Sequence, residues 1–441
     1  MATYAHVVGW GKYIPEKVVT NHDLAKILDT SHDWIESRTG ILERRHADRE
    51  KNETTASMAI AAARLALDRA RIVPTAVDMV IVATLSPEHI FPSTASLVQD
   101  AIGATHAGAF DLSAACSGFV YAFSVGSAMI ESGAAKVVLV IGAENVSAFL
   151  DEKDRSVYPL FGDGAGALVL QAHNVPGGVL STVLGSDGSG AEHLGIPAGG
   201  SKFPTSQHTL DNRLHYMQMN GREVYRFATR VMGRVSKQAC EKAGLEISEI
   251  DLFIPHQANI RIIQSATKYL KIDEDKVFVN LQKYGNTSAA SIPIALCEAI
   301  EQGRVKTHDK IVMVGFGGGL SWGATVVEWG VPMPLKPRSW LYRSMRWFVY
   351  RWAELRSESL RVSRKIENML PERDGTKEGV LEPDDDVKPE ENGRPPMSKN
   401  GSSSNGNGHK PNQKDSDIAK LPSATAEEGE VEKVKKPSKE K

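Results

Sequence analysis

The chain has 441 residues, of which 41% are hydrophobic and 24% charged, values typical of a globular protein with a large core. Its 52 basic and 54 acidic residues leave a net charge of −2, so composition does not indicate a nucleic-acid binder. Three widely spaced cysteines, Cys116, Cys240 and Cys297, exclude a disulfide scaffold and argue against a zinc site. Without a signal-peptide pattern or a run of about 18 apolar residues, we expect a cytoplasmic protein.

Apolar, strand-like segments alternate with helix-length segments up to about residue 330. The expected strands are short and fully apolar, at residues 79–84, 136–141, 167–170 and 310–314. Apolar strands between helices are typical of a sheet that is covered on both faces. The pattern therefore predicts an α/β fold.

A weak internal repeat divides this part of the chain into two halves, which we place at residues 1–172 and 173–330. A helical pattern followed by an aspartate and an apolar strand occurs at Asp78 and again, about 170 residues later, at Asp251. Another pair of helical patterns ends at Gly133 and Gly303, which are also about 170 residues apart. Such a period is too long for a solenoid and indicates two duplicated α/β halves, each with its own sheet.

Cys116 is the candidate nucleophile. It lies in DLSAACSGFVYAF, where a strand-like segment meets small residues and then an amphipathic helix. The positive end of a helix favours the thiolate, and small neighbours allow a tight turn. The alternative is a buried structural cysteine, which we expect for Cys240 and Cys297 within helical patterns. By the offset of the repeat Cys116 corresponds to Asn286, so each half would present one polar residue near a shared centre.

Two further polar residues and one turn are candidates for a site around Cys116. His256, in IPHQANIRII, follows an apolar strand, at the strand end where α/β sites gather. Asn286, in KYGNTSAASIP, would donate its amide hydrogens to an oxyanion or enolate. The plainer alternatives are a structural histidine and a helix N-cap. The glycine-rich turn at residues 315–324 would bring backbone N–H groups close to a ligand.

The segments RTGI, CSGF, GDGAGA, PHQAN, GNTSAAS and FGGG occur in one order. Over residues 4–330 the sequence resembles β-ketoacyl-acyl-carrier-protein synthase III, the thiolase-fold condensing enzyme that starts type II fatty-acid synthesis. The resemblance implies two duplicated halves in an α-β-α-β-α arrangement, and a homodimer. It also implies decarboxylative Claisen condensation of an acyl-CoA primer, acetyl-CoA or similar, with malonyl-acyl-carrier protein, without a metal or other cofactor.

The resemblance assigns roles to individual residues. The catalytic triad would be Cys116, His256 and Asn286, with the N–H groups of Cys116 and Gly318 forming the oxyanion hole. Coenzyme A would be bound by Trp34, Arg38, Arg155, Asn259 and Arg261. The carrier protein would dock on Arg226, Arg261 and Lys268. Phe91 would reach across the dimer interface into the partner's acyl pocket.

The sequence also departs from the family. Tyr225 and Leu320 stand where phenylalanine is frequent, near the tunnel and the acyl pocket, so the sequence does not determine the length of the primer. One alternative is a related ketosynthase with long-chain or secondary-metabolite substrates. Another is a non-catalytic scaffold that binds carrier protein or membrane through its C-terminal extension.

The extension beyond residue 330 has no counterpart in the family. Residues 331–370 read as a linker and a basic amphipathic helix, with nine Lys/Arg against two Glu between residues 336 and 365. Its apolar positions recur every three or four residues, at Leu341, Met345, Phe348, Trp352, Leu355, Val362 and Ile366. Such a helix suits a peripheral contact with an anionic membrane, or it packs on protein. Residues 371–441 contain no Phe, Trp, Tyr or Cys, and we expect them to be disordered.

Overall fold

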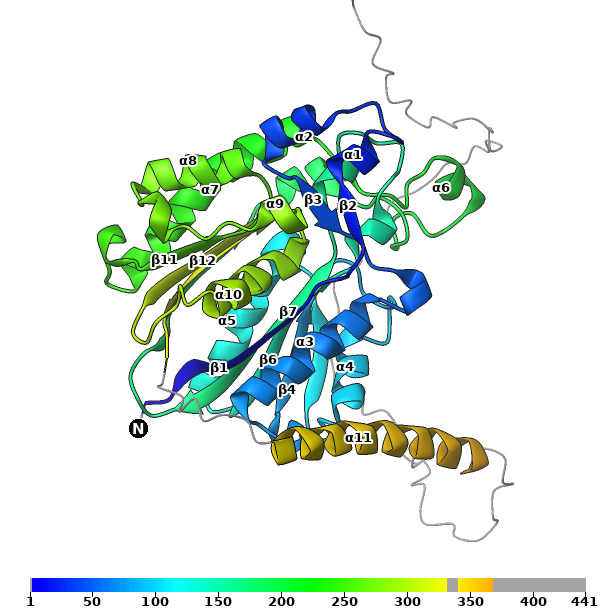
Figure 1. Ribbon diagram of the computed structural model, residues 1–441, viewed down its shortest axis with the longest axis vertical. Coiled ribbons are helices and arrows are strands. Elements are labelled where there is room, and N and C mark those ends of the chain that lie inside the picture. Colours follow the sequence, from blue (N-terminus) through cyan, green and yellow to red (C-terminus); the bar gives the residue numbers. More distant parts are fainter. Residues whose placement is uncertain (1, 331–339, 368–441) are drawn as a thin grey trace, which may run out of the picture. The chain divides into compact units, whose positions relative to one another are not determined.

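The computed structural model describes residues 2–330 and 340–367 (Figure 1). The expected linker at 331–339 and the expected disorder of residues 371–441 lie outside the described residues. Among the helices that are described, none is long and apolar enough to cross a membrane.

The first half of the chain forms a five-stranded sheet. The strands lie in the order β1-β7-β6-β4-β5, with parallel pairs β6–β4 and β4–β5 and antiparallel pairs β1–β7 and β7–β6. Their bounds are Tyr4–Tyr13 (β1), Met79–Ala83 (β4), Gly108–Leu112 (β5), Val137–Glu144 (β6) and Gly164–His173 (β7). The apolar sequences of β4 and β6 follow from burial on both faces of the sheet.

The second half repeats this topology in a four-stranded sheet of order β8-β13-β12-β11. The strands are Gly178–Ser186 (β8), Leu252–Pro255 (β11), Lys310–Gly317 (β12) and Ser321–Glu328 (β13). Only the pair β11–β12 is parallel, as β4–β6 is in the first sheet. Beyond β11, an isolated parallel bridge between Phe253 and Val277 takes the place of β5. The duplication expected from the sequence is therefore present in the strand order.

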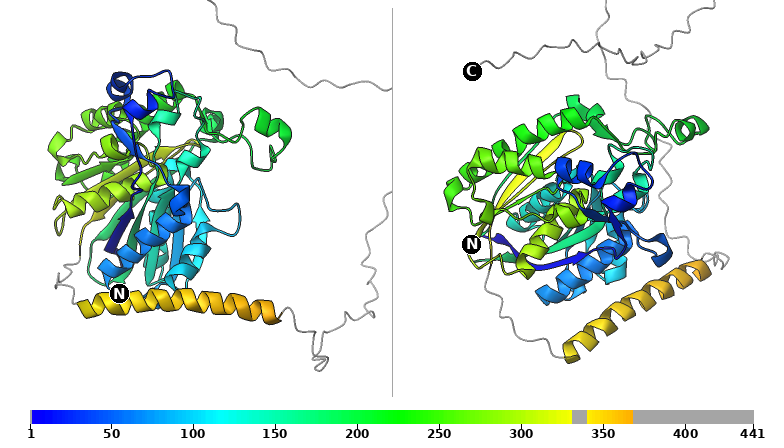
Figure 2. Two further views of the ribbon diagram at one scale, coloured as in Figure 1. Left: turned by 45° about the vertical axis from the view of Figure 1, so that its right-hand side comes forward. Right: turned by 45° about the horizontal axis from the view of Figure 1, so that its top comes forward.

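Helices form three layers around the two sheets (Figures 1 and 2). On the outer face of the first sheet lie α3 (Thr55–Ala70) and α4 (Thr94–Ile102). On the outer face of the second lie α7 (Gly221–Lys242) and α8 (Ile260–Leu270). Between the sheets lie α5 (Gly118–Glu131) and α10 (Ser291–Glu301), which contact both. The α-β-α-β-α arrangement is confirmed.

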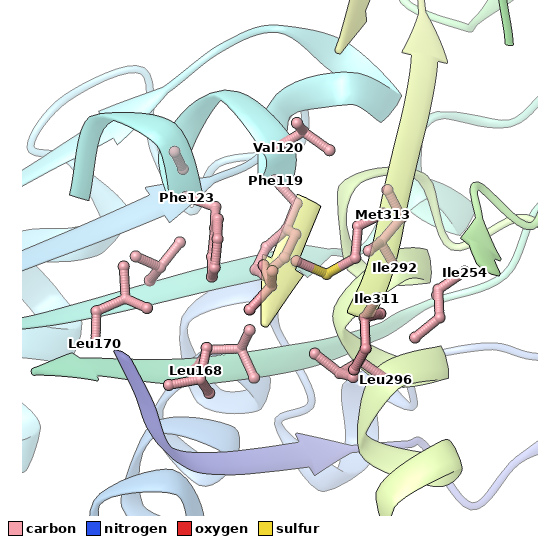
Figure 3. Close-up of a cluster of buried hydrophobic side chains, with 14 of the residues drawn as sticks. Phe119, Val120, Phe123, Leu168, Leu170, Ile254, Ile292, Leu296, Ile311 and Met313 are labelled. Carbon is pink, nitrogen blue, oxygen red and sulfur yellow. The ribbon is translucent and has the colours of Figure 1, made fainter. Parts of the chain in front are cut away.

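Apolar side chains fill the layer between the two sheets. Figure 3 shows Phe119 and Phe123 of α5 beside Leu168 of β7 and Met313 of β12, and all four are fully or almost fully buried. A helix packed between two sheets is apolar over most of its surface, which explains the sequence of α5. The dense packing fixes the positions at which α5 and α10 begin, and the candidate site lies there.

In the structure, the residue of the second half that corresponds to Cys116 is not the one expected from the sequence repeat. A short 3-10 turn precedes each central helix, Ala115–Ser117 before α5 and Ser288–Ala290 before α10. The first residue of each turn has a positive φ, 47° and 48° respectively. These turns align Cys116 with Ala289, not with Asn286. The offset measured at the helix ends was misleading because α5 has 14 residues and α10 only 11.

Shorter elements connect the layers. They are β2 (Val18–Thr20), β3 (Glu43–Arg45), β9 (Leu194–Gly195), β10 (Gln218–Met219), α1 (Asn21–Leu24), α2 (His32–Thr39), α6 (Gln207–Asp211) and α9 (Leu281–Tyr284). The helix expected in the extension is present as α11 (Trp340–Glu367), and it contacts α4.

Candidate active site

Cys116 lies in the turn between β5 and α5. The turn is strained, since Ala115 has a positive φ of 47°. The end of β12 packs directly against it: a Cβ on Gly317 would lie 2.6 Å from the backbone nitrogen of Cys116. Only glycine permits this approach. The second half of the chain therefore holds the thiol of the first half in place.

The thiol of Cys116 is almost completely buried. Burial raises the pKa of this thiol to about 12, and the charge of Glu144 acts in the same direction. Hydrogen bonds with the Ser288 side chain, the Cys116 backbone N–H and the Asn286 side chain lower the pKa of the thiol. Because desolvation is the largest effect, the free thiol is protonated near neutral pH. Desolvation of the buried thiol thus opposes the preference for the thiolate that the helix start gives.

Cys116, His256 and Asn286 line one cavity of about 260 Å³. They come from three places in the sequence: the turn before α5, the segment after β11, and the segment before α10. The walls also include Trp34, Arg38, Tyr225, Asn259 and Phe316. A second cavity of about 170 Å³ shares Cys116 and is lined by Gly318 and by apolar residues such as Phe161 and Met217. Cys116 thus lies where a wide entrance meets a smaller apolar pocket.

His256 is buried and held by two hydrogen bonds. Its backbone N–H donates to the Val314 carbonyl at 2.7 Å, and its Nδ1 lies 2.6 Å from the Ser291 hydroxyl oxygen. Burial lowers the pKa of the imidazole to about 3, so the ring is neutral. Nε2 is buried and has no partner among the described residues. The Ser291 hydroxyl can donate to an unprotonated Nδ1; in that tautomer the ring hydrogen lies on Nε2, where it is available to a ligand.

Asn286 is oriented by the turn that follows it. The Ser288 N–H donates to its side-chain oxygen at 2.8 Å, which leaves the amide group for the Cys116 sulfur. Glu144, at the end of β6, accepts hydrogen bonds from the Ser288 hydroxyl at 2.9 Å and the Ala289 N–H at 3.3 Å. Burial raises the pKa of Glu144 to about 7. This carboxyl group anchors the turn and, through it, Asn286.

Sequence reasoning missed Ser291, Ser288 and Glu144. Only indirect features of the sequence could have indicated these residues. An acidic residue ends the otherwise apolar strand VVLVIGAE, and the segment GNTSAAS is rich in hydroxyl groups. Both features indicate a buried polar network, because an unpaired buried carboxyl group is costly.

The entrance of the cavity has an aromatic platform between two cations. The guanidinium carbon of Arg38 lies 4.8 Å from the ring centre of Trp34, and that of Arg155 lies 5.5 Å from it. Arg155 also pairs with Asp29, at 2.6 Å. The predicted residues Trp34, Arg38 and Arg155 are therefore together, although they come from separate segments. Such an arrangement suits a flat, anionic ligand.

Helix α8 connects this platform to the rest of the entrance. Asn259 caps the helix and donates to the Arg38 carbonyl at 3.1 Å. Arg261 is exposed and donates to the Ser37 carbonyl at 2.7 Å. Both predicted residues thus join α8 to α2 beside the cavity.

The remaining predicted residues lie on the surface. Arg226 on α7 and Lys268 on α8 are exposed, and Arg226 pairs with Glu223 at 2.8 Å. Phe91 is 84% exposed and is not among the residues that line either cavity beside Cys116. A role for Phe91 therefore requires a second molecule.

Two similar α/β halves that meet at a buried cysteine, histidine and asparagine define a condensing enzyme of the thiolase-like class. The family model 3-oxoacyl-[acyl-carrier-protein] synthase III matches residues 110–188, and the model of its C-terminal part matches residues 240–329. The β-ketoacyl-[acyl-carrier-protein] synthase III of Clostridioides difficile (strain 630) is 51% identical over 329 residues, 75% of this chain and 99% of that protein.

Solved structures agree with this result. The 3-oxoacyl-[acyl-carrier-protein] synthase III from Aquifex aeolicus VF5 has a TM-score of 0.69 and 48% identity, covering 74% of this chain and 100% of its own. The priming β-ketosynthase of the R1128 polyketide pathway has a TM-score of 0.70 and 35% identity, covering 75% and 98%. This chain belongs to the β-ketoacyl-acyl-carrier-protein synthase III family, which confirms the resemblance.

The hydrogen bond from Ser291 predicts the tautomer of His256. In the intact protein we expect the hydrogen on Nε2, whereas Ser291→Ala should give a mixture of tautomers because the hydroxyl no longer stabilises an unprotonated Nδ1. Nitrogen-15 NMR of histidine-labelled protein measures this, with a His256→Ala spectrum for assignment. Ser291→Thr, which keeps the hydroxyl, should resemble the unmodified protein. Identical spectra for Ser291→Ala and the unmodified protein would contradict the assignment.

Proposed function

We propose that this enzyme carries out the priming condensation of fatty-acid synthesis, joining the acyl group of an acyl-CoA to malonyl-acyl-carrier protein. The proposal rests on one observation: Cys116, His256 and Asn286 line the same cavity. At the entrance of this cavity the Trp34 ring lies close to two arginine side chains. The first step needs a nucleophile, and the second needs hydrogen-bond donors for an enolate. One cavity contains both.

In the first step the Cys116 sulfur attacks the thioester carbonyl of acyl-CoA. The backbone N–H groups of Cys116 and Gly318 stabilise the oxyanion, each contributing about 3 kcal/mol. The bond between the carbonyl carbon and the CoA sulfur then breaks, the thiol proton passes to that sulfur, and CoA leaves. The acyl group stays on Cys116 and extends into the apolar cavity that Cys116 shares with Gly318. Product release before the second substrate binds gives ping-pong kinetics.

In the second step malonyl-acyl-carrier protein enters the same cavity. Its carboxylate leaves as CO₂, and the electron pair of the broken C–C bond forms an enolate. His256 Nε2–H and the Asn286 amide donate hydrogen bonds to the enolate oxygen. A neutral histidine is suited to this role because a donor is needed and not an acid. The enolate carbon attacks the acyl carbonyl, and the Cys116 thiolate is released.

The entrance suits coenzyme A. Trp34 and Arg38 would hold the adenine ring, and Arg155 would lie on the adenine side. Asn259, which lines the cavity, would contact the pantetheine arm, and Arg261 would lie at the mouth of the pantetheine channel. The scheme requires no metal and no prosthetic group.

We also propose that the enzyme is a homodimer and that the first sheet forms the contact. Within the described residues, the outer edge of β5 pairs with no other strand. Nearby, Ile90 is 87% exposed and Phe91 84% exposed. A second copy would cover these apolar side chains, and its Phe91 would close the smaller, apolar cavity beside Cys116.

A cytoplasmic location fits the cysteines. All three are buried and unpaired in the structure, as expected in a reducing compartment. The Cys116 thiol must stay reduced for the first step.

The alternative is a related ketosynthase with long-chain or secondary-metabolite substrates. Such a ketosynthase would use the same three residues, so the two functions differ in the acyl chain that Cys116 accepts. The cavity of about 170 Å³ favours a short acyl group.

Intact-mass measurement with a series of acyl-CoAs tests the primer. We expect one acetyl or other short acyl group per chain on Cys116, and a loading rate at least about tenfold lower for chains of eight or more carbons, since such chains overfill the pocket. Cys116→Ala should give no adduct. Faster loading of long chains would support the alternative ketosynthase.

Separate assays of the two steps test the roles of His256 and Asn286. Replacing either residue by alanine should leave acylation of Cys116 largely intact and lower CO₂ release from malonyl-acyl-carrier protein by at least ~10²-fold, because the enolate loses a donor. Acylation is followed by intact mass and decarboxylation by labelled CO₂. Loss of acylation with normal CO₂ release would reverse the assignment.

Charge reversal at Lys268 tests the docking of the acidic carrier protein. Lys268→Glu should raise the KM for malonyl-acyl-carrier protein about threefold to tenfold at low salt, with a smaller effect at high salt. The KM for acyl-CoA should not change. Lys136→Glu, an exposed lysine at the start of β6, is the matched control. Equal effects of the two substitutions would exclude this surface.

A further inference from the structure

One face of α11 is attached to the first sheet's outer helices. The Tyr350 hydroxyl lies 3.3 Å from the Arg64 carbonyl oxygen and 3.2 Å from a carboxylate oxygen of Asp68, both on α3. The guanidinium group of Arg64 lies 4.9 Å from the centre of the Tyr350 ring. Tyr350 is accordingly buried.

The same face continues along α4. Ala353 is buried at Gly103, where an added Cβ would lie 2.8 Å from that of Ala353. Ser357 donates to Asp100 at 2.5 Å, and Arg361 pairs with the same carboxylate at 3.2 Å. Tyr350, Ala353, Ser357 and Arg361 recur every three or four residues, so they form one side of the helix. We call this side the docked face.

Four of the apolar residues expected from the sequence to form one face have described side chains, and none of these four is on the docked face. Trp352 is 69% exposed, Phe348 64%, Val362 55% and Leu355 49%. Residues of an α-helix are about 100° apart around its axis, which puts these four side chains roughly opposite the docked face. We call them the apolar seam. α11 therefore packs on the synthase, as one of the two alternatives from the sequence expected. This packing leaves the apolar seam uncovered.

Arginines flank the seam on both sides. Arg351 precedes Trp352 and Arg356 follows Leu355, and both are exposed. By helical geometry the first lies on one side of the seam and the second on the other. Residues 340–367 contain seven basic and three acidic residues, whereas the whole chain has a net charge of −2. The remainder of the chain is thus net negative, whereas α11 is net positive and has Arg351 and Arg356 beside the seam.

We propose that α11 binds this enzyme to the surface of an anionic bilayer, with the apolar seam among the lipid chains and the flanking arginines at the phosphate groups. Tryptophan, leucine and phenylalanine bordered by arginine are the composition of a helix that lies in a membrane interface. The contacts of the docked face set its orientation, so the seam faces away from α3 and α4. The substrate entrance lies on other elements, at α2, α7 and α8.

Charge favours a lipid surface over a second copy of α11. Two apolar seams in contact would bring the flanking arginines of both copies together, and like charges oppose such pairing. An anionic headgroup layer instead neutralises them. An acidic protein could also pair with the arginines, but charge pairing alone would not use the exposed Trp352 side chain. Binding to an acidic protein is therefore one of the outcomes that the experiment distinguishes.

Co-sedimentation of the full chain with vesicles tests the proposal. We expect binding to phosphatidylglycerol vesicles, little binding to phosphatidylcholine vesicles, and release from the former as salt is raised. The double substitution Trp352→Ser/Leu355→Ser should weaken vesicle binding at least about tenfold, since both side chains lose apolar contact with lipid. Val175→Ser is the matched control, because Val175 is 47% exposed at the turn after β7.

Acylation of Cys116 and the carrier-protein KM are measured for the same variants. Normal acylation shows that the substituted chain is folded, and binding is measured without substrates, so failure to bind vesicles is distinct from failure of the proposed reaction. Absence of binding to anionic vesicles, or equal binding of the double variant and the unmodified chain, would overturn the proposal. A raised KM for the carrier protein with unchanged vesicle binding would also overturn it, in favour of a protein partner.

Discussion

The arrangement of the site depends on a reciprocal contact between the two halves. Each half has a glycine at or near the end of a central strand, and the strained turn of the other half packs against that glycine. A Cβ on Gly317 would lie 2.6 Å from the Cys116 nitrogen, and one on Gly142 would lie 2.3 Å from the Ala289 carbonyl oxygen. Because backbone meets backbone without an intervening side chain, the two helix starts approach each other. The cavity between them can then be small.

Burial at this contact determines the protonation of the site. It raises the pKa values of Cys116 and Glu144 and lowers that of His256, so each group favours its neutral form. The site is therefore organised by hydrogen bonds and not by ion pairs. Ser291 holds the imidazole, and Ser288 together with Glu144 holds Asn286. Donors in a buried, preorganised site stabilise developing negative charge strongly. This is the requirement of both an oxyanion and an enolate.

The surface elements are separate from this centre. The entrance platform uses α2 and α8, while α11 is attached to α3 and α4 at the first sheet. A helix attached by Tyr350 and Ser357 does not need its apolar residues for folding, which leaves Trp352 and Leu355 available for binding. Catalysis and surface attachment can thus change independently of each other.

The sequence by itself determined the α/β class, the duplicated halves and the choice of Cys116, His256 and Asn286, because apolar periodicity and ordered motifs are local patterns. It did not determine that Cys116 aligns with Ala289, since that depends on the unequal lengths of α5 and α10. Nor did it identify Ser291 and Glu144, whose roles arise from contacts between distant segments. The amphipathic pattern predicted α11, but only tertiary packing decided that its polar side would be attached to the protein. The protonation of the thiol was likewise decided by burial, because desolvation depends on every neighbour and cannot be read from spacing.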